Sequence, residues 1–395
     1  MEQDIFILDG ARTAIGTFGG ALSTFTPAEL GALAAKSAIE RSGVAAQDID
    51  NAVAGNVIPN SPRDLYLGRV IGIESGLPTS APGLTLNRLC GSGAQAIATA
   101  ASIIRAGESS ISLAAGSEVM SSAPYSIANH RKGQKMGDAA LTDWLLGSLT
   151  DPFGCGGMGI TAENIAAKYE ISRGEQDAFA LDSQQKAVRA ITEQRFESQI
   201  VPLTVKTRKG VQSVTEDEAP RRDTTLDGLA ALRPTFRNDG TVTAGNASGI
   251  NDGAAAVVLA SGAEVAARGL RPRGKLLSWA VAGVPPEIMG IGPAHAVPLA
   301  LQRCGINLDQ IDVIESNEAF AAQAIAVNRL LDLPLEKVNP NGGAIALGHP
   351  LGATGIILTV KALYELERIG GRYGLVTMCI GGGQGIALVI ENCRT

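Results

Sequence analysis

Residues 87–117 read NRLCGSGAQAIATAASIIRAGESSISLAAGS, and this stretch decides the fold class of the chain. A cysteine, Cys90, stands before a Gly-rich turn, an Ala/Ile-rich helical run follows from Gly93 to Ala106, and an apolar strand covers Ser110 to Ala115. Strand and helix alternate in the same way along much of the chain. The pattern therefore predicts an α/β fold whose sheet is mostly parallel and covered by helices.

The position of Cys90 suits a reactive thiol. At the start of a helix a sulfur faces backbone N–H groups and the positive end of the helix dipole, and both favour the thiolate. The glycines after Cys90 let another molecule approach the sulfur closely. The alternative is a buried structural cysteine in front of a packed helix.

Composition and charge narrow the class of protein. The chain has 395 residues, of which 45% are hydrophobic and 48 are glycine, so we expect two or three units around a sizeable core. The net charge of -6 argues against nucleic acid or an anionic membrane as the main partner. No apolar run is long enough to span a bilayer.

The cysteines indicate a reducing compartment. The chain has 5 cysteines, an odd and scattered set that forms neither a disulfide framework nor the C-x-x-C spacing of a zinc site. The acidic start, Met1 to Ile5, enters a strand directly and does not resemble a signal peptide. We therefore expect a cytoplasmic protein without a bound metal or cofactor. Dinucleotide binding is not predicted, because no early strand leads into a G-x-G-x-x-G turn.

The composition of the sequence and its predicted elements change in the middle of the chain. There it carries more charge, one helix around Thr161 to Arg195 and a long irregular piece from Lys206 to Arg237. The apolar run Ala254 to Leu259 then reads as a core strand returning to the first unit. A long insertion in a compact domain usually carries function. The predicted parts are an N-terminal half (1–120 plus 247–270), an inserted loop domain (121–246) and a C-terminal half (271–395).

Three further segments combine polar or nucleophilic side chains with small residues at strand–helix junctions, where α/β folds gather their sites. They are Asn317–Ala321, Asn339–Gly355 and Met378–Gly385. In the second, glycines clear space around His349, which could take the proton of a thiol, although a single histidine can also be structural. In the third, Cys379 leads into three glycines, whose N–H groups favour an oxyanion site beside a reactive sulfur.

Together these four segments resemble those of the thiolases, the family of acetyl-CoA acetyltransferases and 3-ketoacyl-CoA thiolases. The resemblance starts at Arg12–Gly16, runs through Val242–Gly253 to Cys379 and covers essentially the whole chain. It implies a layered αβαβα fold of two similar halves with a long inserted loop domain. Residues Pro62–Arg69 and Ala123–Tyr125 are most similar to bacterial β-ketothiolases that accept chains longer than acetoacetyl.

The resemblance also implies roles. Cys90 would take the acyl group from one CoA thioester, His349 would activate it, and Cys379 would move the proton of the α-carbon of the second. Backbone N–H groups of Cys90 and Gly381 would hold the acyl-enzyme oxyanion. Asn317, through a water and together with His349, would stabilise the enolate oxygen. A covalent intermediate implies ping-pong kinetics.

For CoA, the resemblance implies contacts that lie mostly in or beside the insertion. Arg221 would face the phosphates of the nucleotide, where a guanidinium is suited to bind, although its acidic neighbours leave a solvated surface charge as the alternative. The remaining residues would touch the pantetheine or wall the acyl channel: Ser248, Ala244, Gly249, Phe236, Leu149, Met158, Ala319, Phe320 and Met289.

One position departs from the family pattern. Many biosynthetic thiolases carry a histidine just before the methionine of the insertion's Met-Gly pair, whereas this chain has Gly157 before Met158. A polar contact to the pantetheine is lost or taken over by water, which bears on CoA affinity and acyl-chain preference. Cys155, two residues earlier, is either a second reactive thiol or a spectator.

The sequence thus predicts a thiolase that condenses two acyl-CoAs reversibly to a 3-ketoacyl-CoA and CoA. The first alternative is a decarboxylating ketoacyl synthase, although such an enzyme would carry a histidine or asparagine in place of Cys379. The second is an acyl-CoA-binding homologue without catalysis. The resemblance further implies a homotetramer, with residues 121–148 as the tetramer loop. Acyl length and the physiological direction stay open.

Overall fold

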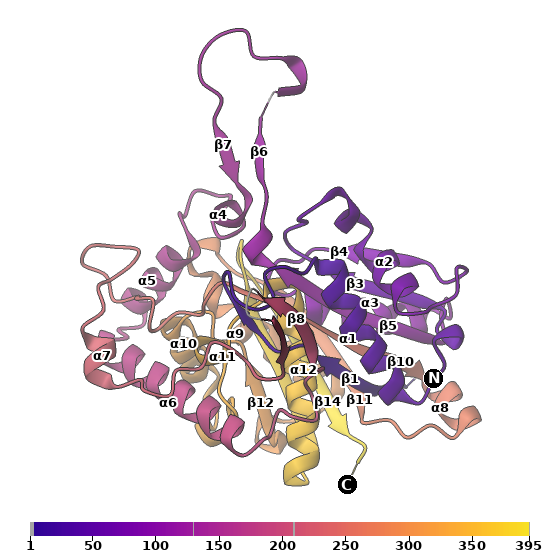
Figure 1. The fold of residues 1–395 in the computed structure, drawn as a ribbon. Coiled ribbons are helices and arrows are strands. Elements are labelled where there is room, and N and C mark those ends of the chain that lie inside the picture. Colours follow the sequence, from indigo (N-terminus) through magenta and orange to yellow (C-terminus); the bar gives the residue numbers. More distant parts are fainter. Residues whose placement is uncertain (1–3, 129, 208–209, 395) are drawn as a thin grey trace.

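The computed structural model describes residues 4–128, 130–207 and 210–394. A 10-stranded sheet with the order β12-β13-β14-β11-β1-β10-β5-β3-β4 forms its frame, and β2 pairs with β10 (Figure 1). The strands of this sheet are β1 (Ile5–Arg12), β2 (Gly16–Thr17), β3 (Asn51–Gly55), β4 (Gly83–Leu86), β5 (Ile111–Val119), β10 (Asn251–Ser261), β11 (Gly274–Gly283), β12 (Val313–Ser316), β13 (Tyr373–Ile380) and β14 (Gln384–Asn392).

The helices complete five layers. Helices α1 and α2 cover the outer face of the N-terminal strands, and α9 covers the outer face of the C-terminal strands. Between them α3 and α12 pack against each other, and α12 contacts β5 and β10 of one half and β12 and β13 of the other. The predicted αβαβα fold is confirmed. These helices, with three further ones, are α1 (Pro27–Ser42), α2 (Leu67–Glu74), α3 (Ser92–Arg105), α8 (Gly262–Arg268), α9 (Gly292–Cys304), α10 (Ala321–Leu331), α11 (Ala344–Leu347) and α12 (Leu351–Ile369).

Glycines set the close approach of α3 and α12. A Cβ atom added to Gly355 would lie 2.1 Å from the backbone nitrogen of Ala94, and one added to Gly93 would lie 3.0 Å from the carbonyl oxygen of Gly352. Only glycine leaves room for two backbones at this separation. The contact brings the N-terminal ends of both helices together, and with them the loops that carry Cys90 and His349.

The expectation of a mostly parallel sheet was wrong. Among the described residues the parallel pairs are β12–β13, β3–β4 and β3–β5, at the two ends of the sheet, and the central pairs are antiparallel. The turn Gly381–Gly383 joins β13 directly to β14, and so short a connection permits only antiparallel strands. Three register pairs between β1 and β11, beginning with Ile5 and Leu276, join the two halves into one sheet.

The insertion leaves the sheet after β5 and returns as β10. The predicted single helix over 161–195 is in fact two helices, because Glu170 adopts a left-handed φ of 53° and Ser172 starts a new helix with a capping box. The β6–β7 hairpin stands away from the rest of the molecule (Figure 1). The elements of the insertion are β6 (Tyr125–Ile127), β7 (Leu141–Asp143), α4 (Trp144–Ser148), α5 (Met158–Lys168), α6 (Arg173–Thr192), β8 (Leu203–Thr207), β9 (Gly210–Val214) and α7 (Leu226–Ala230).

A buried ion pair fastens the insertion to the first strand. The guanidinium of Arg12, at the end of β1, bonds both carboxylate oxygens of Asp217 at 2.7 and 3.0 Å. Both side chains are fully buried, so this contact fixes the place where the insertion passes the sheet. The division of the chain into three parts stays a prediction. Within the described residues, none of the helices has the length and apolarity that crossing a membrane requires.

Candidate active site

Cys90 lies in a tight turn between β4 and α3. Leu89, just before it, has a φ of 46°, a left-handed conformation that costs a β-carbon-bearing residue energy. Three local hydrogen bonds hold this turn: Leu89 N–H donates to the Asn87 side chain at 2.8 Å, Arg88 N–H donates to the Ser92 hydroxyl at 2.9 Å, and the Ser92 hydroxyl donates to the Leu89 carbonyl at 2.7 Å. The turn thus places the sulfur at a fixed position beside the N-terminus of α3.

His349 stands between α11 and α12 in a defined tautomer. The hydroxyl of Thr354 donates its single proton to the carbonyl of Pro350 at 2.9 Å, so at 2.7 Å from His349 Nδ1 it acts as acceptor. Nδ1 therefore carries the ring proton, and Nε2 is the acceptor nitrogen of the ring. Burial lowers the pKa of His349 to about 4, which keeps the imidazole neutral at pH 7.

Asn317 follows directly on β12 and meets His349. Its Nδ2 lies 3.4 Å from His349 Nε2, and its backbone N–H donates to the carbonyl of Thr377 in β13 at 2.9 Å. The Asn317 side-chain oxygen is buried and has no hydrogen-bond partner among the described residues. The side chain can therefore accept a further hydrogen bond inside the site.

Cys379 lies near the end of β13, beside the glycine turn that leads to β14. The backbone N–H of Gly381, in this turn, donates a hydrogen bond to the sulfur of Cys90. Burial raises the pKa of Cys379, and the charge of Cys90 raises it further, so the two sulfurs are close enough to interact. The structure thus brings Cys90, Cys379 and Gly381 together, and it brings Asn317 to His349.

The expected thiolate at Cys90 is not the resting form. Burial raises the pKa of Cys90 to about 11, and the charge of Glu118 acts in the same direction. Hydrogen bonds from the N–H groups of Gly381 and of Cys90 itself favour the thiolate, but they are outweighed. The helix start is visible in the sequence, whereas the cost of removing the sulfur from water is not. A base is therefore needed, and His349 is a neutral one.

A cavity of about 670 Å³ lies against the insertion and reaches Gly348, next to His349. Three of the residues predicted to contact CoA line it, namely Arg221, Ala244 and Gly249. Arg221 is exposed at its rim, and none of the described residues forms an ion pair with its guanidinium. Its neighbour Arg222 pairs with Glu216 at 3.2 Å instead. The guanidinium of Arg221 is thus free for an anionic ligand.

The other predicted wall residues pack around the two cysteines. Leu149 joins the apolar cluster beside Cys90, and four residues join the cluster beside Cys379: Met158, Met289, Ala319 and Phe320. The ring of Phe236 meets that of Phe320 edge to face, with centroids 6.2 Å apart. Ser248 donates its backbone N–H to the carbonyl of Ala319 at 3.0 Å, and its side chain has no contact that assigns it a role.

Position 157 has room for a side chain. Gly157 is the N-cap of α5, and a Cβ atom there would meet only the carbonyl oxygen of Leu149, at 3.8 Å. Cys155, close by, is partly exposed and its pKa is raised, first by desolvation and then by Asp151. A raised pKa disfavours the thiolate, which supports the spectator interpretation of Cys155.

Two family models match the chain, one described as "Thiolase, N-terminal domain" over residues 5–263 and the other as "Thiolase, C-terminal domain" over residues 270–392. The chain belongs to the thiolase family.

Named relatives cover this thiolase from end to end. The chain is 53% identical to the beta-ketothiolase BktB of Cupriavidus necator over 99% of the chain and 100% of that protein. It is 47% identical to an acetyl-CoA acetyltransferase of Pseudomonas aeruginosa, again over 99% and 100%. A crystal structure of human mitochondrial 3-ketoacyl-CoA thiolase in complex with CoA superimposes with a TM-score of 0.96, at 44% identity and over 99% and 98% of the two chains.

Two residues that support the site of this thiolase were not predicted from the sequence. Glu118, buried at the end of β5, accepts hydrogen bonds from the backbone N–H groups of Val57, Ile58 and Gly352 at 2.8–3.0 Å, and so fastens the N-terminus of α12 to the first half. Burial raises its pKa to about 7. A glutamate ending an apolar strand was a visible signal. Thr354 gave none, because its role depends on the turn of α12 that brings it to the imidazole.

The described residues hold no cluster of metal ligands. Across residues 4–128, 130–207 and 210–394, no three His, Cys, Asp or Glu side chains are grouped so that they could hold a metal ion. The expectation of a reaction without metal or cofactor stays a prediction.

Proposed function

We propose that this thiolase condenses two acyl-CoAs reversibly to a 3-ketoacyl-CoA and CoA. The observation that carries the proposal is the pair of neighbouring cysteines in one site, Cys379 buried and Cys90 partly exposed, with the N–H of Gly381 near the sulfur of Cys90. A neutral histidine whose Nε2 carries no proton completes the set. One thiol can hold an acyl group while the other moves a proton.

In the first half-reaction Cys90 becomes acylated. Its proton passes to Nε2 of His349, and the sulfur forms a bond to the thioester carbonyl carbon. The carbonyl oxygen becomes an oxyanion, which the N–H groups of Cys90 and Gly381 stabilise. The bond from that carbon to the CoA sulfur then breaks, and the leaving thiolate takes the proton of Cys379. Cys379 is left as a thiolate beside the imidazolium of His349.

In the second half-reaction a new carbon–carbon bond forms. Cys379 removes a proton from the α-carbon of the second acyl-CoA, and Asn317, through a water, together with His349 stabilises the enolate oxygen. The α-carbon attacks the acyl carbon on Cys90, the carbon–sulfur bond breaks, and the Cys90 thiolate recovers the proton of His349. Both cysteines and the histidine return to their starting states, so the cycle balances.

We further propose that CoA thioesters bind in the cavity beside the insertion, with Arg221 facing the phosphates. Its guanidinium, which forms no ion pair with a described residue, and the reach of the cavity to Gly348 support this placement. The crystal structure of the human relative is a complex with CoA. Ala244 and Gly249 would lie along the pantetheine, and Ser248 would contact it from the same loop. Phe236, Phe320 and Met289 would wall the acyl channel.

The alternatives are not favoured. A decarboxylating synthase would place a second histidine or an asparagine where this site has Cys379. A non-catalytic binding protein would not need the ordered contacts of His349 with Thr354 and Asn317. The resemblance of Pro62–Arg69 and Ala123–Tyr125 to β-ketothiolases of broad substrate range supports acyl chains longer than acetoacetyl. Turnover of five- and six-carbon 3-ketoacyl-CoAs at a rate comparable to acetoacetyl-CoA would support this preference, and turnover of acetoacetyl-CoA alone would contradict it.

The assembly in this proposal is a homotetramer. The projecting β6–β7 hairpin carries exposed apolar side chains, among them Met136 at 91% exposure and Leu141 at 63%, which suits a contact with other copies. The edge strand β4 is exposed at Leu84. Light scattering should give four copies of the 40.6 kDa chain, and a smaller assembly for a chain in which a Gly-Ser turn replaces the hairpin. A monomer for the unaltered chain would contradict this part.

A cytoplasmic setting belongs to the same proposal. Cys90 and Cys379 are free thiols, as are Cys155, Cys304 and Cys393, and the mechanism needs the first two reduced.

The decisive test of function is the Cys90→Ala variant. Acetoacetyl-CoA thiolysis should fall by roughly 10⁴-fold or more, because the covalent route is lost. The exposed Cys393→Ala variant is the matched control and should keep full activity. Retained thiolysis in Cys90→Ala would overturn the proposal.

A further inference from the structure

Arg88, two residues before Cys90, extends from the Cys90 turn to the hairpin that carries Cys379. Its guanidinium Nη1 donates a hydrogen bond to the side-chain oxygen of Gln384 at 3.0 Å. Gln384 is the first residue of β14 and follows directly on the glycine turn 381–383. A single side-chain contact thus links the turn of one thiol to the turn beside the other.

The glycine turn has no side chain with which to hold its position. Residues 381–383 are all glycine, and Gly382 and Gly383 adopt left-handed φ angles of 78° and 86°. The N–H of Val284 donates to the carbonyl of Gly383 at 2.8 Å, which ties the turn to the segment after β11. That bond does not involve the Cys90 turn, so the placement of the glycine turn beside Cys90 depends on other contacts.

The Cys90 turn and the glycine turn pack closely against each other. A Cβ atom added to Gly91 would lie 2.5 Å from Cδ1 of Ile380, so the backbone of the Cys90 turn approaches β13 closely. A Cβ atom added to Gly381 would lie 3.3 Å from Cδ1 of Leu89. Apolar contacts of this kind hold two surfaces together but have little directional preference, so they do not fix how one turn is placed along the other.

The bond from Arg88 to Gln384 supplies this direction. Residues 87–92 and 378–385 are all described, and between these two segments it is the one hydrogen bond that joins two side chains. A guanidinium donates from a planar fork, and a hydrogen bond is strongest when the acceptor lies in line with the N–H group. The acceptor here is a neutral amide, so the contact fixes geometry and does not neutralise a charge.

We propose that Arg88 is a positioning residue of this thiolase, which through Gln384 holds the glycine turn in place against Cys90. The N–H of Gly381 then stays beside the sulfur. The inference rests on the proposed function, because that N–H would stabilise the oxyanion during acylation of Cys90. When the bond is removed, the turn shifts and the oxyanion loses one of its two donors. Arg88 does not line the cavity proposed for CoA, so the rate should change more than the binding of CoA.

Thiolysis of acetoacetyl-CoA by variants of the full-length enzyme tests the proposal. Arg88→Met and Gln384→Met keep the approximate length of each side chain and remove one end of the bond. In each variant kcat should fall about tenfold, while KM for CoA changes less than about twofold. The double variant should also lose about tenfold, and not about a hundredfold, because both residues act through one contact.

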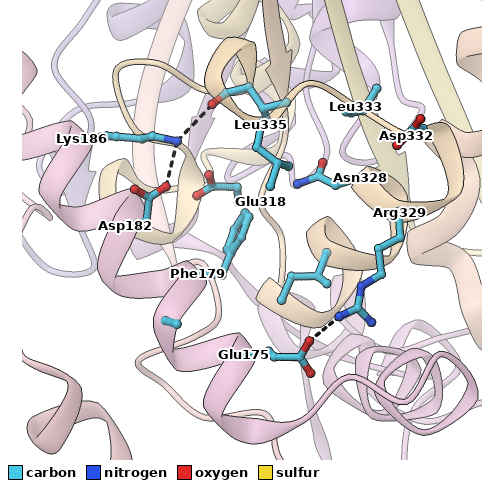
Figure 2. A pocket seen from close by; sticks show the side chains of 13 residues that line it. Glu175, Phe179, Asp182, Lys186, Glu318, Asn328, Arg329, Asp332, Leu333 and Leu335 are labelled. Atoms are coloured by element: carbon cyan, nitrogen blue, oxygen red, sulfur yellow. Dashed lines mark hydrogen bonds and ion pairs between the residues drawn. The ribbon is translucent and has the colours of Figure 1, made fainter.

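Two further variants control for the acceptor and for the substitution itself. Gln384→Glu keeps an acceptor for the guanidinium, so kcat should stay within about twofold of the wild type. Arg329→Met makes the same change at the edge of a separate cavity between α6 and α10, where Arg329 pairs with Glu175 (Figure 2). Arg329 is exposed, and this variant should keep full activity.

Hydrogen exchange, followed by mass spectrometry, reports on the glycine turn without any substrate. The peptide over residues 381–384 should exchange faster in Arg88→Met and in Gln384→Met than in the wild type, and at the wild-type rate in Arg329→Met. A wild type without thiolysis would contradict the proposed function, whereas unchanged exchange in the first two variants would contradict the positioning role alone.

The proposal is overturned if Arg88→Met keeps a kcat within about twofold of the wild type, or if the losses of the single variants multiply in the double variant. It is also overturned if Arg88→Met loses activity and Gln384→Met does not, because Arg88 would then act through its charge or its bulk and not through the bond.

Discussion

Cys90, which is partly exposed, and Cys379, which is buried, are two thiols in one site, and their surroundings differ. The sulfur of Cys90 lies at the start of α3, where the N–H groups of Gly381 and of its own residue lower its pKa. Cys379 lies within β13, and its own backbone N–H is the one group that lowers its pKa. Burial raises both pKa values, to about 11 for Cys90 and further for Cys379.

This difference separates the two tasks. N–H groups aimed at one sulfur can stabilise the negative charge that develops there during acyl transfer. Cys379 has fewer N–H groups near its sulfur to stabilise a thiolate. It therefore keeps its proton until a base stronger than the imidazole of His349, such as a leaving CoA thiolate, removes it. Because the pKa of His349 is about 4, the resting site holds neutral thiol and neutral imidazole, and the charge appears only when substrate reacts.

The largest effect on activity among the tests of this difference between the two cysteines should come from His349. Replacing His349 by Gln removes the base for Cys90, so kcat/KM for thiolysis should fall by roughly 10²–10⁴-fold. His295→Gln, at an exposed position of α9, is the matched control and should retain activity. A loss smaller than about tenfold in His349→Gln would show that another group activates Cys90.

His349 should also make the stability of the folded protein depend on pH. Its pKa is about 4 in the folded protein, below the ordinary value of 6.5, so the unfolded state binds more protons between these pH values. The contribution of His349 to stability is therefore complete above pH 6.5 and declines as the pH falls toward 4. Urea unfolding of wild type and His349→Gln at pH 4.5–7.5 should converge as the pH falls. Parallel curves would contradict the assignment of a buried, neutral imidazole.

A smaller effect should come from Thr354, which holds the imidazole tautomer. Thr354→Val has the same shape but cannot accept the Nδ1 proton, so kcat should fall about 10–100-fold with little change in KM. Thr354→Ser restores the hydroxyl and should recover most of the activity. Equal losses in both variants would mean that Thr354 serves only packing.

The ion pair that holds β12, the strand paired with the Cys379 strand β13, can be tested by measuring the stability of the protein. Lys361 in α12 bonds Glu315 of β12 at 2.6 Å, and both side chains are buried. Lys361→Met should cost about 3–5 kcal/mol in urea unfolding, because it leaves a buried carboxylate unpaired. The double variant Lys361→Met/Glu315→Leu should recover much of that loss. A single variant as stable as wild type would show that the pair does not support β12.

The smallest effect concerns CoA binding. Gly157→His should lower KM for CoA about 2–10-fold, since the position is open and one hydrogen bond could form. Gly157→Leu adds bulk without a donor and should not lower KM. If both substitutions have the same effect, a polar contact at residue 157 is not what sets CoA affinity.

Much of the fold could be predicted from the sequence, because the local signals were strong. The helical run predicted over Gly93–Ala106 is α3 (Ser92–Arg105), and the strand predicted over Ser110–Ala115 lies within β5 (Ile111–Val119), apart from its first residue. The parallel sheet was wrong because alternation of strands and helices does not report the direction of pairing. The short glycine turn after β13 did carry that information.

The sequence predicted which residues form the site better than it predicted their protonation states. The sequence placed Cys90, His349, Cys379 and Asn317 near small residues, and the structure brings Cys90 to Cys379 and Asn317 to His349. Burial, which sets the protonation of the titrating members, comes from contacts between segments far apart in the chain, such as α3 with α12 and, around Cys379, the cluster with Met289 and Phe320. Glu118 and Thr354 act through such contacts as well.

The division of labour between the two thiols is tested most directly by the mass of the intact protein after exposure to acetyl-CoA. Cys379→Ala should gain one acetyl group on Cys90 and retain it, because acylation is possible and condensation is not. Cys90→Ala should gain none. If Cys379→Ala stays unmodified while Cys90→Ala becomes acetylated, Cys379 is the nucleophile and the assignment of the two cysteines is reversed.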